Sequence, residues 1–95
     1  MAAQRLTDDR FHLIAKALAD PRRYDLLRRI GKAGDTLSCE SIRTGCCEVT
    51  PATISHHMKE LETAGLVEPT RDGKFVTYRL RRDVLDAYLA RMAQI

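Results

Sequence analysis

Three thiols are the most reactive side chains of this chain. Cys39, Cys46 and Cys47 lie close together in the sequence. Three thiolates can hold a soft thiophilic ion such as arsenite, antimonite or cadmium in a trigonal site, and vicinal thiols can also sense redox state. A free cysteine is commonly just a small buried hydrophobic residue. The spacing leaves three interpretations open: a metalloid site, a redox sensor and structural cysteines.

Other residue types that carry catalysis are not arranged for it. His12, His56 and His57 are accompanied only by scattered carboxylates, in an order of elements that does not assemble a catalytic triad. The sequence contains no glycine-rich phosphate loop, no His-Glu-x-x-His and no nucleophile elbow. The thiols also lack the Cys-x-x-Cys spacing of disulfide oxidoreductases. These patterns argue against an enzyme.

The segment 50–67 is predicted to form a helix with one apolar and one polar side. Thr50 can accept hydrogen bonds from the first free N–H groups of the helix, and Pro51 suits its first position. Gly65 can take the left-handed conformation that ends a helix. The apolar stripe between these signals consists of Ile54, Met58 and Leu61.

A rotation of about 100° per residue places small, polar and cationic residues opposite that stripe. A helix that enters the major groove of DNA needs such a face, because its side chains contact base edges and phosphates. Alanine and the threonine methyl can touch a thymine methyl, and a histidine can donate to a base acceptor. We predict contacts with bases for Ala52, Thr53 and His56, and with phosphate oxygens for Thr50, Ser55 and Lys59.

His57 lies beside the apolar stripe rather than opposite it. We therefore interpret His57 as a partly buried structural histidine, in contrast to its neighbour His56.

After Gly65 the pattern changes from helical to alternating. The pair Asp72-Gly73 favours a tight two-residue hairpin turn. Pro69 cannot donate a hydrogen bond to a sheet, so its strand is expected at an edge. The returning strand carries Val76, Tyr78 and Leu80 on one side.

Positive charge is concentrated around this hairpin. A net charge of +3 and a pI near 9.0 permit a polyanionic partner without requiring one, whereas local clusters of cations are what phosphate neutralisation needs. At the predicted tip, Arg71 and Lys74 would reach the DNA backbone or the adjacent minor groove. The hairpin cluster is completed by Arg79, Arg81 and Arg82. For an earlier group, Arg22, Arg23, Arg28 and Arg29, a solvated helix face is an equal alternative.

The remaining elements are predicted from helical spacing and punctuation. We expect further helices over residues 8–19, 21–32, 38–43 and 82–94, with Tyr24, Leu27 and Ile30 buried on the second. The predicted fold class is mainly α with a small β-hairpin: a winged helix-turn-helix of five helices and a two-stranded wing, in the order of four helices, two strands and a last helix. Residues 1–95 form one domain.

The last predicted helix has a wider apolar stripe than so small a domain needs. Together with two residues of the first helix, it forms a candidate self-complementary dimer surface; the alternative is packing onto the core of one protomer. The candidate surface consists of Phe11, Leu13, Leu85, Tyr88, Leu89 and Met92.

Composition limits the class of protein. The chain has 95 residues, enough for one core, and its 44% hydrophobic and 31% charged residues are ordinary for a globular protein. No apolar run approaches the roughly 20 residues that span a bilayer. The N-terminus lacks the apolar region of a secretory signal, so we expect no membrane partner, a cytoplasmic location and reduced thiols.

Several segments in this order resemble the ArsR family of bacterial winged-helix repressors. They are Ala17–Leu27 with its Leu-Ala-Asp-Pro-Arg-Arg motif, Thr50–Val67 with Ser-His-His-Met-Lys-Glu-Leu, Arg71–Lys74 and Tyr78–Leu80. The resemblance implies a homodimer built from the first and last helices, with two recognition helices in successive major grooves of a palindromic operator. It also implies that an effector releases the DNA.

The chain departs from the family's two familiar metal sites. The third predicted helix lacks the family's Cys-x-Cys, and Asp83 and Asp86 on the last helix are not followed by a histidine. We therefore predict no bound metal or cofactor, with arsenite at Cys39, Cys46 and Cys47 as the alternative.

The predicted function is a sequence-specific dimeric regulator, more specifically a repressor, that binds double-stranded operator DNA. One alternative is a repressor that senses metalloids or redox state through its thiols. Another is a winged-helix module that binds protein rather than DNA.

Overall fold

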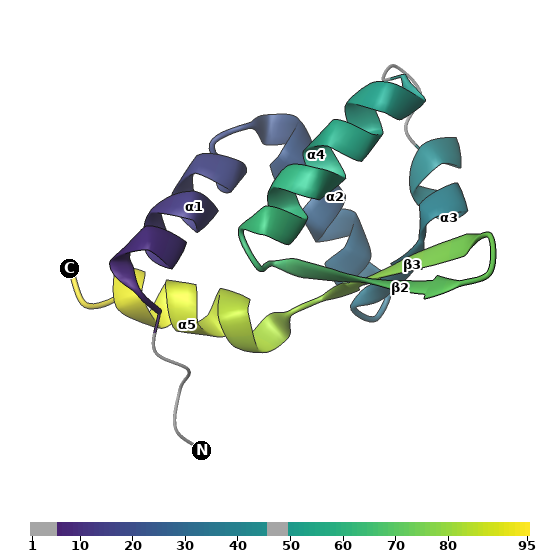
Figure 1. The fold of residues 1–95 in the computed structure, drawn as a ribbon. Helices are drawn as coiled ribbons and strands as arrows, with labels where there is room; N and C mark the ends of the chain where they lie inside the picture. Colours follow the sequence, from purple (N-terminus) through teal and green to yellow (C-terminus); the bar gives the residue numbers. More distant parts are fainter. Residues whose placement is uncertain (1–5, 46–49) are drawn as a thin grey trace.

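A computed structural model describes residues 6–45 and 50–95 of the chain. Within them the chain forms five helices and one three-stranded antiparallel sheet (Figure 1). No helix in these two ranges is both long and apolar enough to cross a membrane. In chain order the elements are α1 (Asp8–Leu18), α2 (Pro21–Lys32), β1 (Thr36–Ser38), α3 (Cys39–Thr44), α4 (Pro51–Thr63), β2 (Val67–Asp72), β3 (Phe75–Leu80) and α5 (Arg82–Met92).

α2 and α4 begin, and α4 ends, at the predicted capping signals. The Asp20 side chain accepts a hydrogen bond of 2.8 Å from the Arg22 N–H at the start of α2. Thr50 Oγ1 accepts one of 3.2 Å from the Thr53 N–H at the start of α4. Gly65 has a φ of +83° just after α4, which an L side chain rarely adopts. The prediction of a helix between Thr50 and Gly65 is therefore confirmed.

The sheet has a third strand that the sequence did not predict. β1 pairs antiparallel with β3, so the strand order is β1-β3-β2 rather than a two-stranded wing. β1 is only three residues long and its partner is distant in the chain, so it leaves no alternation to detect. Pro69 lies in β2, at an edge of the sheet as predicted.

The hairpin turn lies one residue later than predicted. Asp72 pairs with Phe75, so the two loop residues are Gly73 and Lys74 rather than Asp72 and Gly73. Gly73 has a φ of +61°, and a positive φ at the first loop residue is where a two-residue turn favours glycine. The shift places Lys74 at the tip itself.

The core lies where α1, α2, α3, α4 and α5 meet the sheet. Its largest fully buried side chains are Ile14, Ile30, Ile42, Met58, Leu61 and Leu66.

The predicted burial of Tyr24 is wrong. Leu27 and Ile30 of α2 are buried as expected, but Tyr24 is 55% exposed and Leu26 is buried instead. On this side of α2, Arg23 reaches back to the end of α1, where its Nε donates a 2.8 Å hydrogen bond to the Ala17 carbonyl. Leu26 rather than Tyr24 thus belongs to the buried face of α2, and Tyr24 lies at its edge.

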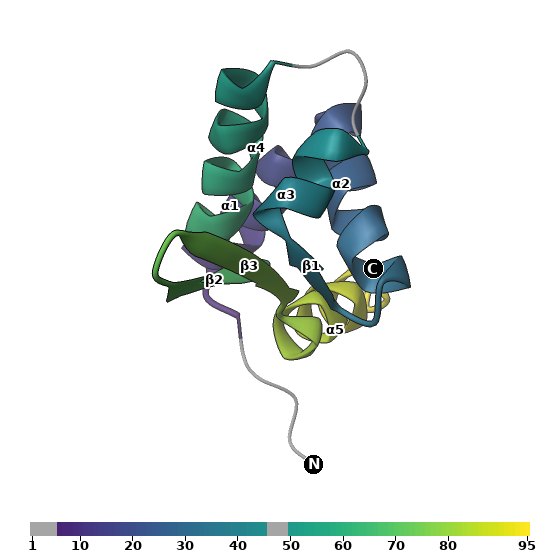
Figure 2. The ribbon, with the colours of Figure 1, turned by 90° about the vertical axis from the view of Figure 1, so that its right-hand side faces the viewer.

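Two groups of elements lie at opposite ends of the molecule. α1 and α5 lie side by side at one end, and the β2–β3 hairpin extends away from them towards the other end (Figure 1). α4 and β2 lie on one side of the molecule, with α2 on the opposite side (Figure 2).

Candidate nucleic-acid interface

The polar side of α4 is open to solvent. Ala52, Ser55, His56 and Lys59 are exposed, and Ile54, Met58 and Leu61 are buried on the opposite side. The structure thus separates the two faces that helical spacing predicted. α3 precedes α4 as the first helix of a helix-turn-helix pair, and α4 is the helix that would enter a groove.

The first turn of α4 is fixed by its own side chains. Thr53 is only half-exposed, because its hydroxyl lies 2.9 Å from the Thr50 hydroxyl. Thr50 itself is exposed. The two hydroxyls stabilise the start of the helix, so Thr53 presents less of its surface to a base than Ala52 or His56.

His56 and Lys59 differ in their electrostatic surroundings. His56 Nε2 lies 3.9 Å from Glu60 Oε1, with the histidine side chain 65% exposed. Among the residues that the structure describes, Lys59 forms no ion pair. Lys59 therefore has its full charge available for a phosphate.

His57 is buried, as the sequence predicted. Only 6% of it is exposed, and neither ring nitrogen has a hydrogen-bond partner within residues 6–45 and 50–95. Burial lowers the pKa of His57 below its ordinary value of 6.5; Asp20 opposes this effect, and Arg23, His56 and Arg22 add to it. His57 is a buried structural residue whose charged form is disfavoured by its surroundings.

We expect His57→Leu to raise the free energy of unfolding by about 1 to 2 kcal/mol at pH 7.5, because buried polar atoms without partners are costly. In the wild-type chain, stability should fall as the pH drops below 6.5, since the unfolded chain then takes up a proton that the folded histidine resists. The His57→Leu variant should not show the part of this loss of stability that comes from His57. Urea unfolding followed by circular dichroism at pH 7.5 and 5.5 measures both effects.

The matched control is His56→Leu, which changes the exposed neighbour. It should change the free energy of unfolding at pH 7.5 by no more than about 0.5 kcal/mol, because its ring is exposed. A His57→Leu variant that is less stable than wild type at pH 7.5 would show that the ring nitrogens have partners after all.

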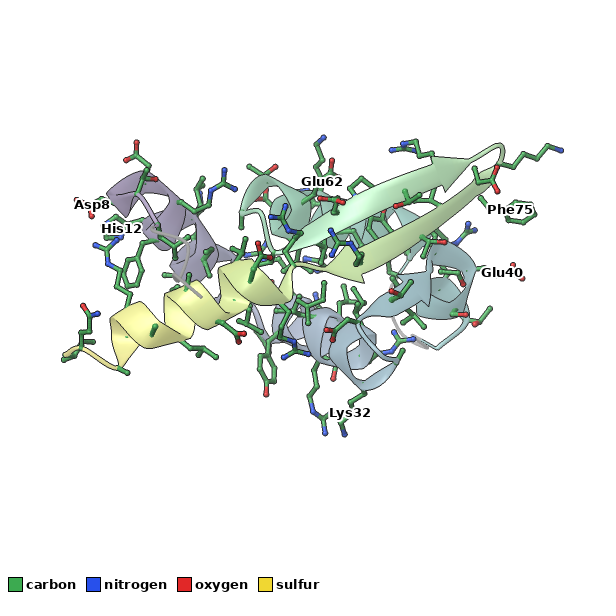
Figure 3. The ribbon with its side chains drawn as sticks, turned by 90° about the horizontal axis from the view of Figure 1, so that it is seen from below. Asp8, His12, Lys32, Glu40, Glu62 and Phe75 are labelled. Carbon is green, nitrogen blue, oxygen red and sulfur yellow. The ribbon has the colours of Figure 1, made fainter. Side chains whose placement is uncertain are left out.

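The tip of the hairpin presents free cations. Within the described ranges, Arg71 and Lys74 form no ion pair, and both are exposed. Phe75 is 70% exposed at the same tip (Figure 3). The tip therefore fits the predicted role of gripping the DNA backbone.

The cations at the base of the hairpin are engaged within the protein. Arg79 and Arg81 both bind Glu68, at 3.1 and 3.2 Å. Arg82 binds Asp35 at 2.6 Å, and this hydrogen bond holds the pKa of the Asp35 carboxyl below its ordinary value. The cationic cluster predicted from the sequence is thus divided into a free tip and a neutralised base.

The four arginines of α2 also fall into two groups, one that bonds to backbone carbonyls and one that is exposed. Arg23 donates to the Ala17 and Lys16 carbonyls at the end of α1, and Arg29 donates to the Ile42 and Ser41 carbonyls of α3. Such bonds satisfy carbonyls that helix ends leave free. Arg22 and Arg28 remain exposed. Sequence spacing gave no signal for these capping roles.

α1 and α5 are joined inside the protomer and still leave apolar surface exposed. The rings of Phe11 and Tyr88 have centroids 5.1 Å apart. Leu89 and Met92 are 54% and 41% exposed on α5, and Leu13 is 39% exposed on α1. Leu13 is two residues from Phe11, so the two residues point to different sides of α1. The dimer surface stays a prediction that rests mainly on Leu89 and Met92.

The thiol hypotheses are not tested by the structure. Cys46 and Cys47 lie outside the described residues. Cys39 is half-buried at the start of α3. Among the described residues no group of three or more histidine, cysteine or carboxylate side chains is placed to hold a metal ion.

A helix-turn-helix pair followed by an antiparallel hairpin with a cationic tip defines the class of the winged helix-turn-helix proteins. The comparisons with known proteins agree. The model of a helix-turn-helix domain family matches residues 18–70. An uncharacterised HTH-type transcriptional regulator of Bacillus subtilis is 34% identical over 80% of this chain and 75% of its own length.

Two further relatives are named for arsenic resistance. An arsenical resistance operon repressor of Staphylococcus xylosus is 32% identical over 77% of this chain and 67% of its own length. An arsenic resistance transcriptional regulator of Pseudomonas putida is 33% identical over 76% of this chain, but the match spans only 55% of that relative.

Solved structures have the same fold. The crystal structure of an ArsR family transcriptional regulator superposes with a TM-score of 0.81 at 20% identity and covers 96% of this chain and 91% of that one. The solution structure of a homodimeric winged helix-turn-helix DNA-binding domain from Mycobacterium bovis has a TM-score of 0.71 at 29% identity and covers 98% of this chain and 88% of that one. The chain belongs to the ArsR family of transcriptional regulators.

Proposed function

We propose that this protein is a homodimeric repressor that binds a palindromic operator in the cytoplasm. In this proposal each protomer inserts α4 into a major groove, and the hairpin tip holds the adjacent phosphates. Base contacts come from Ala52, Thr53 and His56, and phosphate contacts come from Thr50, Ser55, Lys59, Arg71 and Lys74.

The observation that carries the proposal is the exposed polar face of α4 beside a free cationic tip. The face is not used for packing, since the buried residues of α4 lie on its other side. Within the described residues Lys59, Arg71 and Lys74 form no ion pair, whereas the other hairpin arginines are paired. Free charge at two separated points suits a polyanion that runs past both of them.

The dimer part of the proposal is supported by the exposed apolar residues of α5 and by the homodimeric Mycobacterium bovis domain. An inverted repeat in DNA matches the two-fold symmetry of such a dimer. A repressor needs only to occupy its operator, which a DNA-binding face and a dimer surface together allow.

The experiment that tests the proposal separates base contacts from phosphate contacts. Lys59→Ala should weaken binding to all duplexes and reduce the salt dependence, because it removes a phosphate contact. His56→Ala should mainly reduce the preference for the operator over random DNA, by about 1 to 3 kcal/mol for each base that the side chain no longer reaches. Fluorescence anisotropy with labelled operator and random duplexes at several salt concentrations measures both.

Lys16→Ala is a suitable control, because Lys16 is an exposed cation of α1 that forms no ion pair within the described residues. It should change neither preference nor salt slope. Equal losses on operator and random DNA for the His56 and Lys59 variants would contradict the assigned roles.

A further inference from the structure

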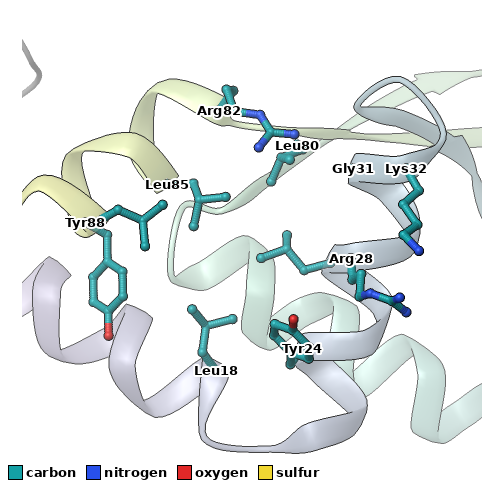
Figure 4. Close-up of a pocket in the computed structure, with 11 residues that line it drawn as sticks. Leu18, Tyr24, Arg28, Gly31, Lys32, Leu80, Arg82, Leu85 and Tyr88 are labelled. Carbon is teal, nitrogen blue, oxygen red and sulfur yellow. The ribbon is translucent and has the colours of Figure 1, made fainter. Parts of the chain in front are cut away.

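An open cavity lies between α2 and α5, on the side of the molecule away from the recognition helix. Its volume is about 400 Å³, within the range of roughly 300–1,000 Å³ that small-molecule sites occupy. α1 and β3 complete its walls (Figure 4). None of the residues assigned to DNA contacts lines it.

The walls of the cavity are apolar. Leu80 from β3 and Leu85 from α5 point into the space, and Leu18 of α1 closes another side (Figure 4). Leu27 lines it from α2. A lining of aliphatic side chains from four elements suits the hydrocarbon part of a ligand.

The edge of the cavity is cationic. Arg28 and Lys32 lie on the α2 side and Arg82 lies at the start of α5 (Figure 4). Arg28 and Lys32 are one helical turn apart, a spacing at which like charges repel. Arg28 has its nearest carboxylate, Asp25, at 4.0 Å, and in the described part of the chain Lys32 forms no ion pair.

One of the three cations at the edge of the cavity, Arg82, is already paired. Asp35 already binds Arg82 at 2.6 Å, so Arg82 contributes little free charge. The remaining cations of the edge are Lys32, which forms no ion pair within the described residues, and Arg28, whose pair with Asp25 is long at 4.0 Å. A carboxylate between them would relieve their repulsion and accept hydrogen bonds from both.

We propose that this cavity binds an amphipathic carboxylate, with its apolar body between α2 and α5 and its carboxylate at Arg28 and Lys32.

The cavity also shares residues with the candidate dimer surface. Leu85, Tyr88 and Leu89 belong both to its wall and to the candidate dimer surface. A ligand that moves α5 relative to α2 changes the distance between the two recognition helices of the dimer. The bound carboxylate thus acts as an effector that lowers operator affinity, a role that rests on the proposed function.

The test uses sodium octanoate, with octan-1-ol as the uncharged probe. Isothermal titration of the purified protein without DNA should show saturable binding of octanoate at one site per chain. Arg28→Gln combined with Lys32→Gln should weaken octanoate binding at least tenfold, because the carboxylate loses both cations. The same change should leave octan-1-ol binding within twofold.

Gly31 provides a matched pair of variants for blocking the cavity. A Cβ at Gly31 would lie 3.5 Å from Arg82 Nη2 and 3.7 Å from Leu80 Cδ2, which are ordinary contacts directed at the cavity. Gly31→Leu should abolish octanoate binding. Gly31→Ala should fold at least as well as wild type, because alanine favours a helix more than glycine does, and should still bind octanoate.

Absence of saturable octanoate binding to the wild-type protein would overturn the site, and so would equal binding by the Gly31→Leu variant. Binding by a monomeric variant but not by the dimer would show that a second copy covers the cavity, and would also overturn it.

The effector role has its own readout. Saturating octanoate should reduce operator affinity at least tenfold in the wild type and not in the Gly31→Leu variant. Octanoate binding with unchanged operator affinity would overturn the effector role. A protein that binds no DNA even without octanoate would contradict the proposed function instead, and the titration without DNA would be unaffected.

Discussion

Replacing Leu89 and Met92 with glutamate is expected to convert the protein to a monomer and to lower operator affinity by about a hundredfold or more. Both side chains are exposed on α5, and a negative charge on each would prevent two copies of this face from packing together. A dimer binds its second half-site at a high effective concentration, and a monomer loses that gain. The variant should bind an isolated half-site as well as wild type does.

Analytical ultracentrifugation gives the oligomeric state, and anisotropy with full and half operators gives the affinities. Ala90→Glu is the control, because it adds one of these two negative charges at an exposed position of α5 outside the candidate surface. A double variant that remains dimeric, or a monomer that binds the full operator as tightly as wild type, would show that another surface joins the protomers or that the dimer is unnecessary.

The second large effect is expected at the hairpin tip. Arg71→Gln combined with Lys74→Gln removes two cations from each protomer, hence up to four phosphate contacts from a dimer. The slope of log affinity against log salt should fall by up to about 3.6, and affinity near 0.1 M salt should drop by roughly two to three orders of magnitude. Operator and random duplexes should be affected alike, because phosphates carry no sequence information.

Arg79→Gln combined with Arg82→Gln changes the net charge by the same amount and serves as the control. These two cations are already bound by Glu68 and Asp35, so their loss should change the salt slope by less than one unit. Equal slopes for the two double variants would mean that net charge, rather than the free tip, governs the affinity.

The sequence predicted those parts of the fold that local chemistry determines. Asp20-Pro21 and Thr50-Pro51 begin helices because their side chains cap free N–H groups, and Gly65 ends one because it adopts a positive φ. These signals act over a few residues and can be read without the tertiary structure. The polar and apolar faces of α4 followed from helical spacing in the same way.

The features that could not be predicted from the sequence depend on contacts between distant residues. β1 exists because it pairs with β3, and nothing local in Thr36–Ser38 marks it as a strand. On α2, Leu26 rather than Tyr24 is buried, and Arg23 donates a hydrogen bond to the Ala17 carbonyl of α1. Likewise, the pairing of Arg79 and Arg81 with Glu68 separates the free tip from the neutralised base. A count of cations cannot show which of them are already paired.

We propose that the exposed side of α4 reads base edges in two successive major grooves. The most direct measurement is selection of bound duplexes from a random pool by the wild-type protein and by His56→Ala. The wild type should enrich an inverted repeat whose half-sites are centred about 10 base pairs apart, and the variant should lose preference at the same position in both half-sites. A pool that yields no enriched sequence, or the same repeat for both proteins with every position equally preferred, would contradict the claim.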